Sequence, residues 1–205
     1  MSELAFASYE IDKLETLPLL FPTGYLTIKN AIRDEGDTFY HLDFPNREVE
    51  AAFEAYLLNE YSGVKKERIE VYAAEMTRML KGGDIDGFMG KMKIFFADIP
   101  YDIQLANEKY YQTIFYIVFR LIGLRMEAEA RTSIGRIDAV AQTEKYVYIF
   151  EFKLNRSSAE ALKQIHDREY YQKYLGSGRE IILVGAKFST KKHNITDWKT
   201  EILKF

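Results

Sequence analysis

The stretch from Gly135 to Leu154 constrains the fold of this chain more than any other segment. It reads as a β-hairpin whose first strand carries Asp138 and whose second, largely apolar strand carries Glu151 and Lys153. Charged side chains at the end of an apolar strand are costly to bury unless they have partners. The hairpin therefore predicts a sheet at the heart of the fold and a charged site on that sheet.

Strand alternation places the charged residues of the hairpin on a common face. Glu151 and Lys153 share one face of the second strand, and Asp138 shares a face of the first strand with Arg136. If the turn is four residues long and begins at Thr143, Asp138 lies directly opposite Glu151, with β-carbons roughly 5 Å apart.

Two carboxylates in this register repel each other unless a cation compensates them. Mg²⁺ suits Asp and Glu oxygens and keeps several of its waters, while Lys153 can hold a water or a phosphate oxygen. Together these groups suit metal-assisted phosphodiester hydrolysis. The alternative is purely structural, with Lys153 paired to Glu151 at the end of a sheet.

The spacing of apolar residues predicts the remaining elements. Four helices are expected over residues 47–60, 66–80, 85–97 and 102–124, followed by strand 126–132, the hairpin, a helix from a capping box at Ser157 to Leu175, and strand 179–186. From residue 102 the order is helix, strand, strand, strand, helix, strand. This order predicts an α/β fold of the α+β type, with a mixed sheet and one right-handed parallel crossover.

The region before these helices is expected to form a small β-hairpin from segments 25–29 and 38–44. We therefore predict a connector over 1–45 and a main domain over 46–205. Within the main domain, 46–100 is the helical part and 101–205 the catalytic core. The loop from Gly82 to Gly87 resembles a calcium loop only faintly, because the closing Glu is missing, and an inter-helix turn is expected.

Composition excludes several classes of protein. The chain has no cysteine, which excludes a disulfide scaffold, a Cys-ligated zinc site and a thiol nucleophile. No signal peptide or membrane-spanning run is evident, so a cytoplasmic protein without membrane attachment is expected. The net charge is −3, but residues 151–205 hold 11 Lys and Arg against 7 Asp and Glu. Any positive field is therefore expected near the second hairpin strand.

Several segments resemble the PD-(D/E)XK nuclease superfamily. They are Thr132–Asp138, Tyr148–Lys153, Ala161–Ile165 and Tyr170. The similarity is greatest to the branch found behind an AAA-type ATPase domain in bacterial and archaeal proteins, often called the DUF1703 group. Leu20–Ile28 and Phe44–Val49 resemble the connector of that branch. Ile137 stands where the motif that names the superfamily has proline.

The resemblance implies a restriction-endonuclease-like core and a set of functional residues. It implies metal ligation by Asp138 and Glu151, orientation of the attacking water by Lys153, an auxiliary metal ligand at Glu108, and a role beside the site for Gln164. It also implies that an AAA-type ATPase partner lies outside this chain, because the sequence has no Gly-x-x-x-x-Gly-Lys-Ser/Thr loop.

Further residues are expected around this set. Glu129 faces out of the strand before the hairpin and is a candidate additional carboxylate. Arg136 and Tyr170 are further candidate auxiliary residues. Gln164, Arg168 and Tyr171 are expected on one helix face that flanks the site and touches a nucleic-acid backbone. For Arg168 the alternative is a solvated surface. The three histidines, His41, His166 and His193, are expected at the surface.

Two functions follow as hypotheses. The first is a nuclease that uses Mg²⁺, or alternatively Mn²⁺, to hydrolyse phosphodiester bonds in DNA, and thus a deoxyribonuclease-like phosphodiesterase. The second is a catalytically silent module of the same fold that docks nucleic acid or a partner protein for an associated ATPase. The complete set of Asp138, Glu151 and Lys153 favours the enzyme, because a docking module has no use for all three.

Overall fold

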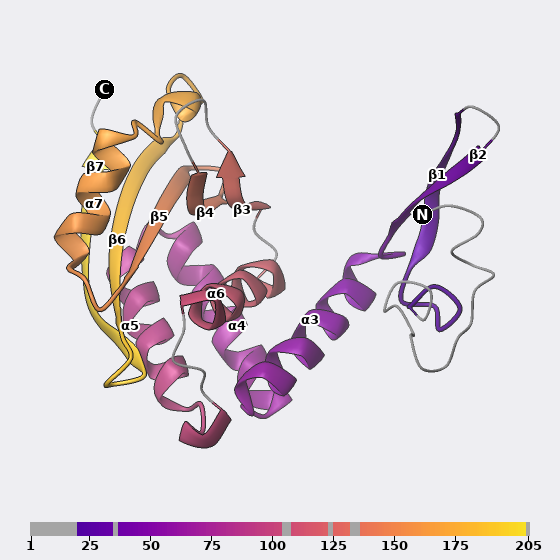
Figure 1. Ribbon diagram of the computed structural model, residues 1–205, viewed down its shortest axis with the longest axis horizontal. Helices are drawn as coiled ribbons and strands as arrows, with labels where there is room; N and C mark the ends of the chain where they lie inside the picture. The colour runs from indigo at the N-terminus through magenta and orange to yellow at the C-terminus, as the bar shows by residue number, and fades with distance from the viewer. Residues whose placement is uncertain (1–19, 35–36, 104–107, 123–124, 132–135, 204–205) are drawn as a thin grey trace. The chain divides into compact units, whose positions relative to one another are not determined.

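A computed structural model describes residues 20–34, 37–103, 108–122, 125–131 and 136–203 (Figure 1). The chain divides into two compact units, Met1–Phe53 and Glu54–Phe205, and each is described by itself. The predicted division into 1–45 and 46–205 stays a prediction. None of the helices in the described part of the chain has both the length and the hydrophobicity of a membrane span.

The first unit contains the expected β-hairpin. Strands β1 (Thr27–Asp34) and β2 (Asp37–Asp43) pair antiparallel. The first strand extends beyond the predicted segment 25–29, because residues up to Asp34 pair across the hairpin, with Ile32 opposite Phe39. Cross-strand apolar pairs of this kind stabilise a ladder that the polar neighbours conceal in the sequence.

The second unit begins with helices that match their predicted ranges closely. These are α3 (Arg47–Ser62), which crosses the boundary between the units, α4 (Lys66–Lys81) and α5 (Ile85–Ala97). The loop between α4 and α5 is an inter-helix turn, because the Asp84 side chain accepts the Gly87 N–H at 2.8 Å and caps α5. The capping of α5 accounts for an aspartate at position 84, so no calcium ion is needed to explain it.

The fourth predicted helix begins later than expected. Residues Tyr101–Ile103 form a 3-10 turn, in which Ile103 N–H donates to Pro100 O at 3.3 Å, and α6 is described over Glu108–Leu121. The tight turn after the proline interrupts the helical pattern, so the predicted start at Asp102 is wrong.

The centre of the unit is a five-stranded mixed sheet. Its strands are β3 (Arg125–Arg131), β4 (Arg136–Gln142), β5 (Tyr146–Leu154), β6 (Glu180–Ser189) and β7 (Asn194–Leu203), adjacent in that order. Strands β5 and β6 run parallel, and the other neighbours are antiparallel. The predicted order of helix, three strands, helix and strand is therefore confirmed, as is the α/β class.

Strand β7 is absent from the sequence prediction, which ends with the strand before it. It forms an edge of the sheet, and several of its side chains face solvent. Polar residues at those positions hide the strand pattern. Ile195 is fully buried and marks its inward side.

Helices cover both faces of the sheet (Figure 1). Helix α7 (Ser158–Asp167) lies on one face, over β5, β6 and β7. Beneath it is an apolar cluster that includes Val140, Val147, Ile149 and Leu183. Helices α4, α5 and α6 pack on the other face around a second, aromatic cluster, whose rings include Phe88, Phe96, Phe115, Phe119, Phe150 and Phe188.

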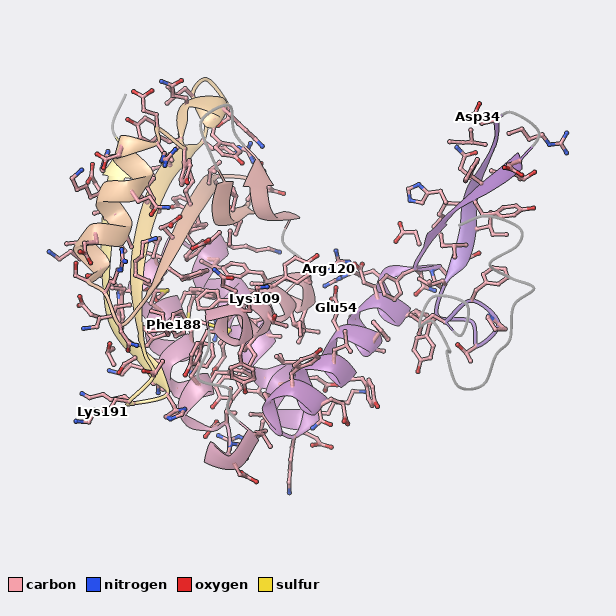
Figure 2. All side chains as sticks on the ribbon, in the orientation of Figure 1. Asp34, Glu54, Lys109, Arg120, Phe188 and Lys191 are labelled. Carbon is pink, nitrogen blue, oxygen red and sulfur yellow. The ribbon has the colours of Figure 1, made fainter. Side chains whose placement is uncertain are left out.

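A buried ion pair joins α3 to α6 within the second unit. Arg120 Nε donates to Glu54 Oε1 at 2.7 Å, and the Glu54 side chain is only 5% exposed (Figure 2). Burial lowers the pKa of Arg120, but hydrogen bonds with Glu54 and Tyr116 outweigh it and raise that pKa above its ordinary value. Arg120 therefore stays charged where the helices meet.

Helix α7 ends earlier than the predicted Leu175. Glu169 adopts a φ of 45°, and Tyr170 N–H donates to Ile165 O at 3.2 Å. Glu169 N–H also donates to His166 O, which completes a Schellman ending. Burial of Tyr170 against Ile165 compensates the strained backbone of Glu169. The stop signal is hidden because Glu, and not Gly, takes the left-handed position.

Close approach of α7 to the sheet depends on Gly185, which pairs with Glu151 across β5 and β6. A β-carbon on Gly185 would overlap the carbonyl oxygen of Ser158 and lie 2.7 Å from Leu162 N. Only a residue without a side chain allows the first turns of α7 to rest on β6. The same contact brings α7 toward Glu151.

Replacing Gly185 with alanine is expected to lower the free energy of unfolding by about 1–3 kcal/mol, because the added methyl group meets backbone atoms. Gly90→Ala in α5 is the matched control. A β-carbon there has no atom within 4 Å, so this change should raise stability by about 0.5–1 kcal/mol. Urea denaturation of both variants measures the two effects, and equal stabilisation by both would contradict the packing argument.

Candidate active site

The register of the hairpin is the one that the sequence predicts. Gln142 pairs with Val147, and the ladder between β4 and β5 extends to the pair of Ala139 and Phe150. One further step brings Asp138 level with Glu151. At that point the Asp138 side chain enters the ladder, because its Oδ2 accepts the backbone N–H of Phe152 at 2.8 Å. The Asp138 carboxylate is thus anchored beside the end of β5.

Glu151 lies at the centre of the charged group. It is only 2% exposed, on the face of β5 that α7 covers. Lys153 Nζ lies 2.8 Å from Glu151 Oε1, and Gln164 Nε2 of α7 donates a hydrogen bond to the same oxygen. A buried carboxylate needs such partners to remain ionised.

The sequence positions Gln164 by fixing both the start and the depth of α7. Ser157 and Glu160 form the predicted capping box: Glu160 N–H donates to Ser157 Oγ at 3.1 Å, and Ser157 N–H donates to Glu160 Oε2 at 2.9 Å. Ser158, which is 1% exposed, donates a hydrogen bond to Asp197 of β7. These contacts fix the first turn, and Gln164 follows on the face that meets β5.

A groove opens beside this group. It has a volume of about 430 Å³ and is lined by Lys153, Arg156, Glu160, Lys163, Gln164, Asp167, Arg168 and Tyr170. Four of these side chains are cationic and two are carboxylates. The groove therefore joins the candidate catalytic residues to a surface that favours anions.

The donor set fits a hard divalent cation. Mg²⁺ takes one or two protein carboxylates and keeps its remaining waters, so Asp138 and Glu151 suffice for it. Among the described residues, no three His, Cys, Asp or Glu side chains form a metal-binding group. A site that coordinates its metal mainly through protein side chains is therefore not present in the described part of the chain.

Three of the predicted site residues are located by their backbone alone. Glu108 is the first residue of α6, Glu129 lies in β3, and Arg136 begins β4. Their side chains lie outside the described part of the structure, so their roles stay predictions. The predicted motif residues 132–135 also lie outside the described residues.

The predicted helix face of Gln164, Arg168 and Tyr171 is wrong. Gln164, Arg168 and Tyr171 cannot share a helix face, because α7 ends at Asp167. Arg168 nevertheless lines the groove with Gln164, and so does the largely buried Tyr170.

Residues that the sequence prediction overlooked also line or shape the groove. Arg156 and Lys163 line it, Asp167 faces Lys163 across one helical turn, and Gly185 sets the depth of α7. The basic excess of residues 151–205 is the signal that pointed to this region. A count of charges over residues 151–205 could not show that Arg156 and Lys163, among the Lys and Arg of that segment, line the groove.

Comparison with known proteins agrees with this core. A family model described as the PD-(D/E)XK nuclease superfamily matches residues 106–198. The "Uncharacterized protein in vnfD 5'region" of Azotobacter chroococcum mcd 1 is 32% identical over 213 residues. That alignment covers 98% of this chain but 40% of the Azotobacter protein. No solved structure matches the chain.

The capping box predicts a pH dependence of stability. Hydrogen bonds from the backbone and hydroxyl of Ser157 lower the pKa of Glu160 below its usual value of 4.5. A depressed carboxyl pKa stabilises the fold above the unfolded pKa, and this contribution is lost as the pH falls through the folded pKa. We therefore expect the stability difference between the wild type and Glu160→Gln to shrink as the pH falls below about 4.5.

Urea denaturation from about pH 6 to about pH 3 measures this difference. Glu144→Gln in the exposed hairpin turn is the control for loss of a carboxylate outside the capping box. A Glu160→Gln difference that grows on acidification would contradict the proposed capping role.

Proposed function

We propose that this chain belongs to the PD-(D/E)XK nuclease superfamily and hydrolyses phosphodiester bonds in DNA with the aid of Mg²⁺. The family match to residues 106–198 supports the proposal, because it includes Asp138, Glu151, Lys153 and Gln164. The observation that carries it is the contact of Lys153 and Gln164 with the same buried oxygen of Glu151, beside Asp138 and at the edge of a cationic groove.

Each residue has a distinct role in this proposal. Asp138 and Glu151 would hold the metal ion, which would supply Lewis acidity and activate water. Lys153 lines the groove, where its ammonium can orient the attacking water or stabilise negative charge that develops on a phosphate oxygen. Gln164 fixes the Glu151 carboxylate through its amide and so keeps the site organised before the substrate binds.

Burial supports the same roles. Because α7 covers Glu151, the carboxylate experiences a low dielectric in which nearby cations interact with it more strongly than in water. The Lys153 side chain is 19% exposed, so its ammonium lies at the boundary between this buried carboxylate and the groove. That position suits a group that must contact both the protein and a phosphodiester.

The second candidate is a silent module that docks nucleic acid or a partner for an AAA-type ATPase. The contact of Lys153 with Glu151 is compatible with this docking module, because a purely structural ion pair would make the same contact. The Azotobacter relative extends beyond its match, since the chain spans 40% of that protein. The AAA-type ATPase partner in this second candidate rests only on the resemblance to the DUF1703 group.

A cleavage assay with linear and plasmid DNA in Mg²⁺ or Mn²⁺ tests the proposed function. Asp138→Asn, Glu151→Gln and Lys153→Met should each lower the cleavage rate by at least about 100-fold, because each removes a group that acts on the reacting phosphate or its metal. Addition of EDTA should abolish cleavage by the wild type.

Lys145→Ala is the matched control, since Lys145 is an exposed lysine at the opposite end of the same hairpin. It should cleave at the wild-type rate. Equal cleavage by all variants would contradict the active-site assignment. Absence of cleavage by the wild type, with DNA binding retained, would favour the docking module.

A further inference from the structure

We propose that the groove beside Lys153 binds the sugar-phosphate backbone of a DNA strand next to the scissile phosphate. In this proposal Arg156 and Lys163 contact the phosphates. Asp167 weakens the affinity for DNA, because it forms an ion pair with Lys163. The inference rests on the proposed function, because it assigns the groove to the same substrate. It adds the residues that hold the substrate away from the reacting bond.

The charge of the groove favours a polyanion despite the chain's net charge of −3. Its four cationic side chains outnumber its two carboxylates. Glu160 is engaged with the backbone N–H of Ser157 at 2.9 Å, so its charge is directed to the start of α7. Asp167 forms an ion pair with Lys163 one helical turn away. Glu160 also interacts electrostatically with Arg156 and Lys153, but the groove as a whole keeps more cations than carboxylates.

The shape of the groove suits an extended strand. Glu160, Lys163, Gln164 and Asp167 follow one face of α7 at helical spacing, and seven residues of helix span about 10 Å. A strand of B-DNA rises 3.4 Å per nucleotide, so this face is about three nucleotides long. A backbone that passes over Lys153 therefore continues along α7.

Arg156 is held in place by the loop that carries it. The preceding residue, Asn155, has a φ of 59°, and its N–H donates to Phe188 O at 2.8 Å. Its side-chain oxygen accepts the Thr190 N–H at 3.0 Å, and its amide donates to Thr190 Oγ1 at 3.0 Å. These bonds tie the loop after β5 to the end of β6. Arg156 is therefore presented to the groove from a fixed backbone.

The ion pair between Lys163 and Asp167 gives the proposal its sharpest test. Both side chains are well exposed, at 71% and 55%, so neither supports the core. Asp167→Asn removes a negative charge from the groove and releases Lys163 for a phosphate. We expect tighter DNA binding from this variant. Tighter binding is the opposite of what loss of the folded groove would give.

The experiment uses the whole chain and a fluorescein-labelled DNA strand of about 15 nucleotides, with EDTA to prevent cleavage. Fluorescence anisotropy gives the dissociation constant over a range of salt concentrations. Arg156→Ala and Lys163→Ala should weaken binding on any base sequence, and each should reduce the salt slope by about 1. Asp167→Asn should tighten binding, and Lys145→Ala should leave affinity and slope unchanged.

The outcomes separate this inference from the proposed function. Wild-type affinity and slope in both Arg156→Ala and Lys163→Ala, or no binding by the wild type, would overturn the groove assignment even if the protein cleaves DNA. Groove-dependent binding without cleavage in Mg²⁺ would support the groove and overturn the hydrolase. Weaker binding by Asp167→Asn would also contradict the assignment.

Discussion

The burial of one carboxylate governs the arrangement of this fold. Glu151 lies at the end of a strand between two helical layers, where an unpartnered charge is costly. Lys153 on the same strand and Gln164 on α7 both contact its Oε1. The second contact requires α7 to lie close to the sheet, which requires Gly185. The charged site and the packing of the fold therefore impose the same conditions on the chain.

The sequence predicted features that depend on local periodicity. Alternation in the hairpin was sufficient to pair Gln142 with Val147 and to direct Asp138 and Glu151 to one face. It was insufficient for the end of α7, where burial of Tyr170 compensates a left-handed Glu169. Such an ending depends on tertiary contacts, and its sequence looks like continuing helix.

Some residues of the candidate site could likewise be predicted from local periodicity, and others depend on contacts between distant segments. Asp138, Glu151 and Lys153 belong to strands whose alternation is visible in the sequence, so they could be selected from it. Arg156 belongs to a loop whose position is set by Asn155 and Thr190, which are 35 positions apart in the chain. Strand β7, which anchors Ser158 through Asp197, was likewise overlooked. Contacts between distant segments have no signature in a single sequence, so the surroundings of the site required the structure.

The two apolar clusters on opposite faces of the sheet have a consequence for how this fold can diversify. Energetic coupling between substitutions fades when the residues share no contacts. Changes in the aromatic layer around Phe96 and Phe115 should therefore combine almost additively with changes under α7 around Val147 and Leu183. The sheet separates the two clusters, so substitutions among α4, α5 and α6 should leave the geometry of the candidate site under α7 unchanged.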